Sequence, residues 1–257
     1  MTFRLEDFEI FILILVRISG FIYTAPLFSL RNVPVRIKAG LSLFLTVILF
    51  YTIPLPDVEY AGTIGYAILA VKEAIAGALM GLFSNIAYQI LSFAGQLMDM
   101  EIGFSMISQL DPVTNIRTTI TANFYSYLVI LLMIITNLHH YFIKAVVDSY
   151  YVIGIGEAYF PPDMYRMMVR FIIDYFIIAM RIVLPIFAAI LVVNTILGIL
   201  AKVAPQMNMF VIGMQLKVLV GLIIFYLIIG YTPSVADFIF NKMKELLLEV
   251  INVMQSG

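Results

Sequence analysis

Long apolar stretches separated by short polar connections dominate this sequence. A helix that crosses a membrane needs about 20 mostly apolar residues, and a closed set of backbone hydrogen bonds favours helices in lipid. We therefore expect six long hydrophobic helices, over residues 8–28, 37–53, 63–93, 122–147, 168–200 and 211–231. Pro185 lies inside the fifth segment and predicts a kink there. The pattern predicts an all-α, polytopic membrane protein.

The C-terminal segment 234–254 has a different pattern. Apolar residues recur at helical spacing, from Val235 and Phe238 to Val250 and Ile251, while Asp237, Lys242 and other polar residues occupy the opposite face. This alternation predicts an amphipathic helix that lies on a membrane or packs on a partner. We expect one domain to span residues 1–257.

Composition strengthens the membrane prediction. Hydrophobic residues make up 63% of the 257 residues, charged residues only 12%, and the mean hydropathy is +1.04. Soluble domains average about 45–50% apolar and about 25% charged residues. The net charge of −1 argues against nucleic acid as a partner, since binding it needs a basic face. Most side chains must therefore face lipid or other protein.

No chemistry typical of an enzyme or a cofactor site emerges from the sequence. The absence of cysteine excludes thiol catalysis and cysteine-ligated metals. His139 and His140 are adjacent, so on a helix they diverge and do not converge on one metal ion. Phosphate-binding, dinucleotide-binding and hydrolase motifs are all missing from the sequence. We expect a protein without catalytic residues, metal or cofactor.

Several charged residues fall inside the apolar segments, and we single out five of them. Each would cost roughly 2.5–3.5 kcal/mol at the centre of a bilayer. We interpret them as buried structural charges that make contacts between helices, with a proton relay as the alternative. The five are Arg17, Lys72, Glu73, Asp174 and Arg181.

A polar stripe follows the second half of the third segment. Its members fall within about 80° on a helix of 3.6 residues per turn. The stripe is either a hydrogen-bonded packing face between subunits or the wall of a wet conduit, and we favour the conduit. It consists of Asn85, Gln89, Ser92, Gln96 and Asp99. On the same helix, Gly77 and Gly81 form a GxxxG pair that permits close approach of a second helix.

The connection 94–121 is long and has an unusual mixed composition, with Met98, Met100, Met106 and Phe104 beside Gly95, Gly103, Asp99 and Glu101. Connections that only join two helices are usually shorter and more polar. Met repacks around irregular shapes, and apolar constrictions close a pore by excluding water. We therefore expect a deformable plug whose residues include Met100, Gly103, Phe104, Met106, Asp111 and Pro112.

Three stretches of the sequence carry motifs whose order and spacing are distinctive. The first holds Arg17-x-x-Gly20, Ala25-Pro26-Leu27-Phe28, Arg31-Asn32-Val33-Pro34 and Lys38-Ala39-Gly40-Leu41. The second runs from Gly95-Gln96 through Gly103-Phe104 to Asp111-Pro112. The third contains Pro205, Gln206 and Asn208 within Ala204–Phe210, followed by Gly213, Leu216-Lys217 and Gly221-Leu222. Together these stretches resemble the FliR family of flagellar and type III secretion export proteins, and the resemblance spans essentially the whole chain.

The resemblance implies a subunit of an export gate. Members of the family join several copies of FliP and FliQ around a pore for unfolded export substrates, in the inner membrane at the flagellar basal body. The loop that matches residues 100–119 would project into this pore and help to seal it. FlhB at the cytoplasmic entrance and FlhA are the further implied partners, along with membrane lipid.

Two other classes of protein compete with this interpretation. A secondary transporter for a small solute would favour inverted repeats and paired broken helices, and neither is evident in the sequence. An intramembrane enzyme would need a paired catalytic constellation, which is also missing. Within the export proteins, the flagellar and the injectisome systems both remain open.

Overall fold

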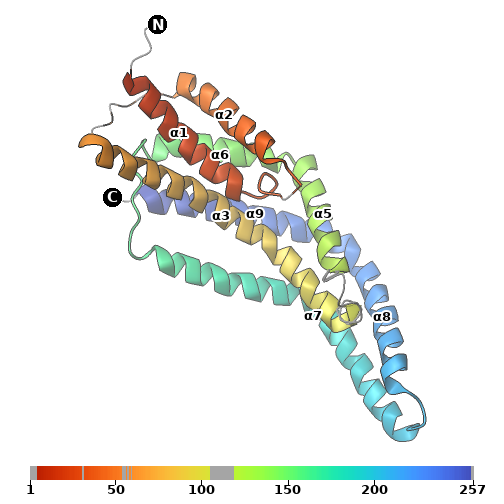
Figure 1. Cartoon of the computed structure of the whole chain (residues 1–257). Helices are drawn as coiled ribbons and strands as arrows, with labels where there is room; N and C mark the ends of the chain where they lie inside the picture. Colours follow the sequence, from red (N-terminus) through yellow and green to blue (C-terminus); the bar gives the residue numbers. More distant parts are fainter. Residues whose placement is uncertain are drawn as a thin grey trace. The chain divides into compact units, whose positions relative to one another are not determined.

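A computed structural model describes residues 5–30, 32–53, 56, 58, 60–104 and 119–255, with side chains from residue 7 onward. These residues form helices joined by short connections and contain no strand, which confirms the all-α prediction (Figure 1). The helices are α1 (Leu5–Thr24), α2 (Val35–Thr52), α3 (Gly62–Ile102), α5 (Ile120–Ile135), α6 (Leu138–Val152), α7 (Met164–Val203), α8 (Met209–Ile228), the 3₁₀ turn η1 (Ile229–Tyr231) and α9 (Thr232–Gln255).

Helix α3 continues nine residues beyond the predicted end of the third apolar segment. We expected a helix over 63–93 and a connection from residue 94, but the helix ends at Ile102. The extension contains Ala94, Leu97, Met98 and Glu101, which are good helix formers, so local propensity outweighed the polar and glycine residues among them.

The single helix predicted over 122–147 is wrong, because the chain breaks between α5 and α6. The two helices meet at an angle of 69° around Thr136 and Asn137. Asn137 adopts a left-handed backbone conformation with φ of 55°. Asn tolerates this conformation better than most residues, so one Asn in an otherwise apolar run suffices for the bend.

Fewer helices qualify as membrane spans than the six expected. Among the described residues, four helices are long and apolar enough, or five if the bent α5–α6 pair forms one span. Helix α1 is not among them, since Asp7, Glu9 and Arg17 all lie within it. The first apolar segment therefore forms its helix but carries too many charges for a simple span.

The chain divides into two compact units. Unit 1 comprises residues 1–88, 133–169 and 239–257, and unit 2 comprises residues 89–132 and 170–238. Unit 1 holds α1, which packs along α2, together with the first part of α3, α6 and most of α9. Unit 2 holds the end of α3, α5, most of α7 and α8. That one export-gate domain spans residues 1–257 stays a prediction.

Helix α9 buries its apolar face within its own chain. Ile239, Met243, Leu247, Val250 and Met254 are all fully buried in unit 1. The main-chain N–H of Tyr159 also donates to the Met254 carbonyl at 3.1 Å. The helix is amphipathic as predicted, but our expectation that this face lies on a membrane or a partner is wrong. The face is instead part of the core of unit 1.

Helices α1 and α3 cross at glycines. A Cβ added at Gly77 would overlap the main chain of Arg17, and one at Gly81 would overlap Thr24 and Ala25. From the other side, a Cβ at Gly20 would come within 2.8 Å of the Ala74 carbonyl oxygen. The predicted role of the GxxxG pair is confirmed, since the two backbones touch where side chains are absent.

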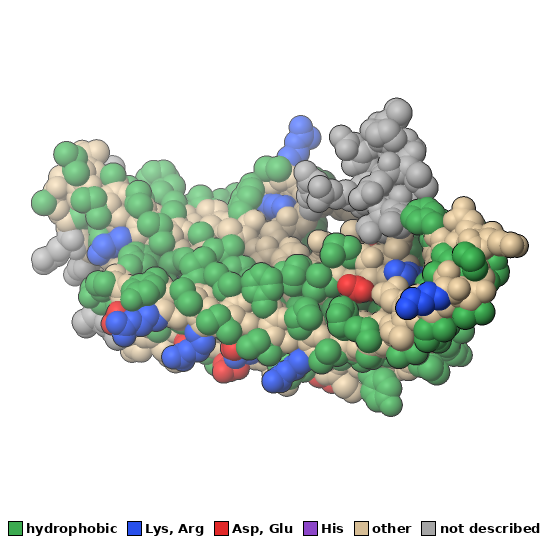
Figure 2. Space-filling view, turned by 90° about the horizontal axis from the view of Figure 1, so that it is seen from below, with side chains coloured by type: hydrophobic (Ala, Val, Ile, Leu, Met, Phe, Trp, Pro, Cys, Tyr) green, Lys and Arg blue, Asp and Glu red, His purple; other side chains and the backbone are tan. Residues whose placement is uncertain are grey.

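Large apolar side chains cover much of the surface of this single chain. Figure 2 shows them over most of the visible face, with few charged side chains among them. Such a surface is far larger than the apolar patches that soluble monomers expose. Exposed examples are Val35, Phe44 and Tyr51 on α2, Ile173, Leu191 and Ile199 on α7, and Leu222, Tyr226 and Leu227 on α8. Lipid or other protein must cover these faces.

The glycine crossing gives a first prediction. Gly77→Ala should lower the free energy of unfolding by about 1–3 kcal/mol, because its methyl group forces α1 and α3 apart. Thermal unfolding followed by far-UV circular dichroism in detergent measures this. Gly40→Ala on α2 is the matched control: its Cβ would meet nothing within 4 Å, and alanine's higher helix propensity should leave stability equal or higher. Equal effects at both positions would contradict the close crossing.

Candidate functional site

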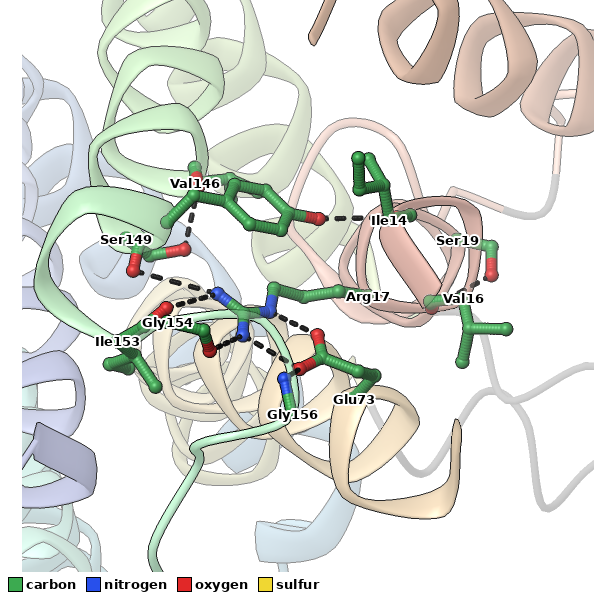
Figure 3. A network of polar contacts seen from close by, with 11 residues as sticks. Ile14, Val16, Arg17, Ser19, Glu73, Val146, Ser149, Ile153, Gly154 and Gly156 are labelled. Carbon is green, nitrogen blue, oxygen red and sulfur yellow. Dashed lines mark hydrogen bonds and ion pairs between the residues drawn. The ribbon is translucent and has the colours of Figure 1, made fainter. Parts of the chain in front are cut away.

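A buried ion pair joins α1 to α3 in unit 1. The side chains of Arg17 and Glu73 are both 0% exposed. The guanidinium meets the carboxylate through two parallel hydrogen bonds, Nε to Oε2 and Nη2 to Oε1, the second at 2.8 Å (Figure 3). This two-bonded geometry is the strongest that arginine and a carboxylate can form.

Arg17 also binds the main chain where α6 ends. Its Nη1 donates to the carbonyl oxygens of Ser149 at 3.5 Å and Ile153 at 3.1 Å, and its Nη2 donates to Gly154 at 3.0 Å. Together with the two bonds to Glu73, these contacts engage the guanidinium in five hydrogen bonds, as many as it has N–H donors. The arginine thereby satisfies carbonyl groups at the C-terminal end of α6.

Glu73 and Tyr150 complete the network from two further directions. The Gly156 N–H donates to Glu73 Oε1 at 2.7 Å. Gly156 has a φ of 83°, which places this turn in a conformation that glycine adopts readily. The ring of Tyr150 lies 4.3 Å from Arg17 Cζ, and its hydroxyl donates to the Ile14 carbonyl at 3.1 Å.

The network binds together three segments that are distant in the sequence. Removing two charges from water costs several kcal/mol each, and only excellent geometry with added hydrogen bonds offsets that cost. Here fixed protein groups occupy every donor of the guanidinium. This favours a structural role for Arg17 and Glu73 over a proton relay, since a relay needs groups that can exchange partners.

The other three predicted charges have different surroundings. Lys72 and Asp174 are half-buried, and Arg181 is exposed. The expected burial of Arg181 is therefore wrong for the single chain, because most of the surrounding face of α7 is uncovered. Arg181 lines a pocket of about 560 Å³ in unit 2, which Pro185 and apolar side chains of α7 and α9 also line.

The polar stripe runs along one continuous helix but is unevenly buried. Gln89 and Gln96 are exposed, Asn85 and Ser92 are half-buried, and Asp99 is buried. The Asn85 amide lies 3.5 Å from the Ser29 hydroxyl, and the Gln89 carbonyl accepts from the Tyr175 hydroxyl at 3.4 Å. The exposed glutamines leave both expectations open, a face for another subunit and the wall of a conduit.

The predicted plug begins directly at the end of α3. Met100 is 63% exposed, Phe104 is buried, and Gly103 has a φ of 98°. Met106, Asp111 and Pro112 lie outside the described residues. An exposed methionine, followed by a glycine whose conformation other residues rarely adopt, marks the place where the chain leaves the helix.

The family-motif residues form the turn between α7 and α8. The Met207 N–H donates to the Ala204 carbonyl at 3.1 Å, which closes a turn around Pro205 and Gln206. Asn208 caps α8, because its Oδ1 accepts from the N–H groups of Phe210 at 3.2 Å and Val211 at 3.4 Å. Pro205, Gln206 and Asn208 are all exposed, so this turn is free to meet another molecule.

Sequence reasoning missed the segment Ser149–Gly156 as part of the buried network. Its contribution is mainly main-chain carbonyl and N–H groups, which any residue type supplies. The one usable signal was the pair of glycines, Gly154 and Gly156, next to a helix end. Among the described residues, no group of three or more His, Asp or Glu side chains is placed to hold a metal ion.

The buried ion pair gives a second prediction. Arg17→Met and Glu73→Leu should each lower the free energy of unfolding by about 3–5 kcal/mol, because each leaves an unpaired buried charge. The double variant should cost less than the sum of the two, since it removes both charges together. Thermal unfolding of the four proteins in detergent gives this coupling. Strictly additive losses would show that the two side chains do not depend on each other.

The comparisons with known proteins agree on one family. The model of the family described as "Bacterial export proteins, family 1" matches residues 8–243. The chain is 33% identical to the flagellar biosynthetic protein FliR of Bacillus subtilis over 226 residues, 87% of each chain. It is 28% identical to that of Pectobacterium carotovorum, covering 94% of this chain and 92% of the relative. Identity to the Escherichia coli protein of the same name is 26%, over 93% and 91%. This chain belongs to bacterial export protein family 1.

Proposed function

We propose that this chain is a non-enzymatic subunit of the flagellar type III protein-export gate. It assembles with homologues of FliP and FliQ, and together they form and seal the pore through which unfolded flagellar proteins leave the cell. The observation that carries this proposal is the family match over residues 8–243, together with relatives named as flagellar biosynthetic proteins.

The surface of the chain supports assembly with other apolar helices. Many of its exposed residues on α2, α7 and α8 are large and hydrophobic. A helix that lies in lipid alone gains nothing from the exposed polar residues Gln89 and Gln96. Neighbouring subunits with polar groups of their own would satisfy these side chains and cover the apolar faces.

The segment between α3 and α5 supports the sealing role. It starts at Gly103, whose φ is 98°, shortly after the exposed Met100, and its sequence up to Asp111 includes the apolar residues Phe104, Met106, Ile107 and Leu110. Flexible apolar side chains of this kind can close around an irregular opening and exclude water and ions. The same side chains can yield when an unfolded polypeptide passes.

The proposal includes a cellular place and further partners. The chain is a multi-pass protein by its apolar helices. We place it in the bacterial inner membrane at the flagellar basal body, with FlhB at the cytoplasmic entrance of the pore and FlhA nearby. An injectisome gate would use the same architecture, but the relatives' flagellar names favour the flagellar system. A small-solute transporter is less well supported. In this chain the buried Arg17–Glu73 ion pair leaves no N–H donor of the arginine free to exchange partners, as a proton relay would require.

Deletion of residues 103–112 tests the sealing role. The assembled complex should still form, but its pore should conduct ions in a planar bilayer, because the apolar barrier is gone. Replacement of the same ten positions by Gly and Ser is the matched variant, since it keeps the length of the connection and removes only the apolar side chains. Conductance unchanged from the parent complex in both variants would refute the plug.

Co-purification tests the partnership. Co-expressed with homologues of FliP and FliQ, the tagged chain should elute with both in one complex, and mass measurement should count one copy of it. The exposed apolar faces should make the chain expressed alone aggregate or require more detergent. A stable solitary chain that retains export activity in cells lacking those partners would contradict the proposal.

A further inference from the structure

We infer that Asp99 is the positioning residue that fastens together the two ends of the 103–119 segment. This inference rests on the proposed gate function and concerns how the sealing segment is held. Asp99 lies at the end of α3 and is 2% exposed, and all of its partners belong to unit 2.

The side chain of Asp99 caps the next helix across space. Both of its carboxylate oxygens accept from the main-chain N–H of Thr121, at 3.0 Å and 3.2 Å. Thr121 is the second residue of α5, whose first turn already begins with the Asn123 N–H donating to the Thr119 carbonyl at 3.1 Å. The first N–H groups of a helix have no partner within it, so a carboxylate placed there satisfies them and also interacts favourably with the helix dipole.

The main chain of the same residue ends the previous helix. The Asp99 carbonyl accepts from the Gly103 N–H at 3.1 Å, and Gly103 then turns the chain away with its φ of 98°. The carbonyl of Asp99 thus takes part in the last turn of α3, and its carboxylate caps the first turn of α5. The segment between them leaves and returns at a single point.

Close packing around Asp99 holds the same two ends. A Cβ added at Gly95 would overlap the backbone of Ala122, so α3 and the first turn of α5 touch without a side chain between them. A Cβ at Gly221 would come within 2.6–3.0 Å of the Ile102 side chain, so α8 packs closely against the last turn of α3. These contacts leave Asp99 little freedom to choose another partner.

The physical consequence is that the end of α3 and the start of α5 are held together. A buried carboxylate is costly unless it is hydrogen-bonded, and Thr121 supplies that bond only while α5 stays against α3. Holding the two ends together also removes conformations from the segment. The bonds between Asp99 and Thr121 therefore keep the end of α3 and the start of α5 together.

Ion conductance of the assembled complex tests this inference. Asp99→Ala should raise the leak about fivefold or more, because a lost helix cap frees the start of α5. Asp99→Asn retains one acceptor oxygen and should leak less than the alanine variant. Asp237→Asn, which alters an exposed carboxylate on α9, is the control and should conduct like the parent complex.

A disulfide provides the decisive variant. The chain contains no cysteine, so Asp99→Cys combined with Thr121→Cys introduces a single pair, in a complex whose partner subunits carry no cysteine. Oxidised with diamide, the pair should restore the seal by a covalent link between the same two points. Reduced with dithiothreitol, it should leak like Asp99→Ala. Asp99→Cys alone should leak in both states, whereas Thr121→Cys alone should seal in both, because it keeps Asp99 and the main-chain N–H that binds it.

The outcomes separate the inference from the gate function. If deletion of 103–112 leaks and Asp99→Ala does not, the fastening role is wrong and the gate stands. If Asp99→Ala leaks but the oxidised pair does not restore the seal, Asp99 acts otherwise and the inference is also overturned. If neither variant leaks, the sealing role itself is refuted, and the fastening role with it. If the complex with Asp99→Ala does not assemble, the double-cysteine variant is compared in its oxidised and reduced states. A leak only after reduction supports the inference, and equal conductance in the two states overturns it.

Discussion

The guanidinium of Arg17 constrains the structure of unit 1 more than any other single group. It is fully buried, and a buried cation is tolerated only when a counter-charge and hydrogen-bond acceptors surround it. Glu73 and three carbonyls at the end of α6 meet that demand. They can do so only because the glycines at the crossing of α1 and α3 let the two backbones touch. The ion pair and the glycine crossing therefore depend on each other.

A second constraint acts on the outside of the chain. Large apolar side chains are exposed along α2, α7 and α8. Such a surface is stable only when lipid or other helices cover it. The same requirement applies to each of the two compact units of the chain, since both hold helices with exposed apolar faces.

Local sequence patterns predicted the helices well and their ends poorly. Hydrophobic periodicity and length placed α1, α2, α7 and α8 close to their observed positions. The break at Asn137 was missed, because one residue in a left-handed conformation leaves almost no trace in an apolar pattern. The end of α3 was missed for the opposite reason: Gly95 suggested a loop, yet it lies inside the helix, where its missing side chain lets α5 approach.

The sequence by itself determined that the chain is helical, membrane-embedded and related to the export proteins, because composition, periodicity and motif spacing are properties of neighbouring residues. It also indicated that the charges at membrane depth needed partners. Only the tertiary structure decided which partners these are. Arg17 pairs with Glu73, 56 residues away, Asp99 caps a helix that begins 21 residues later, and α9 buries its apolar face in its own unit. Such contacts depend on how helices cross in space, and no periodicity along the chain encodes that.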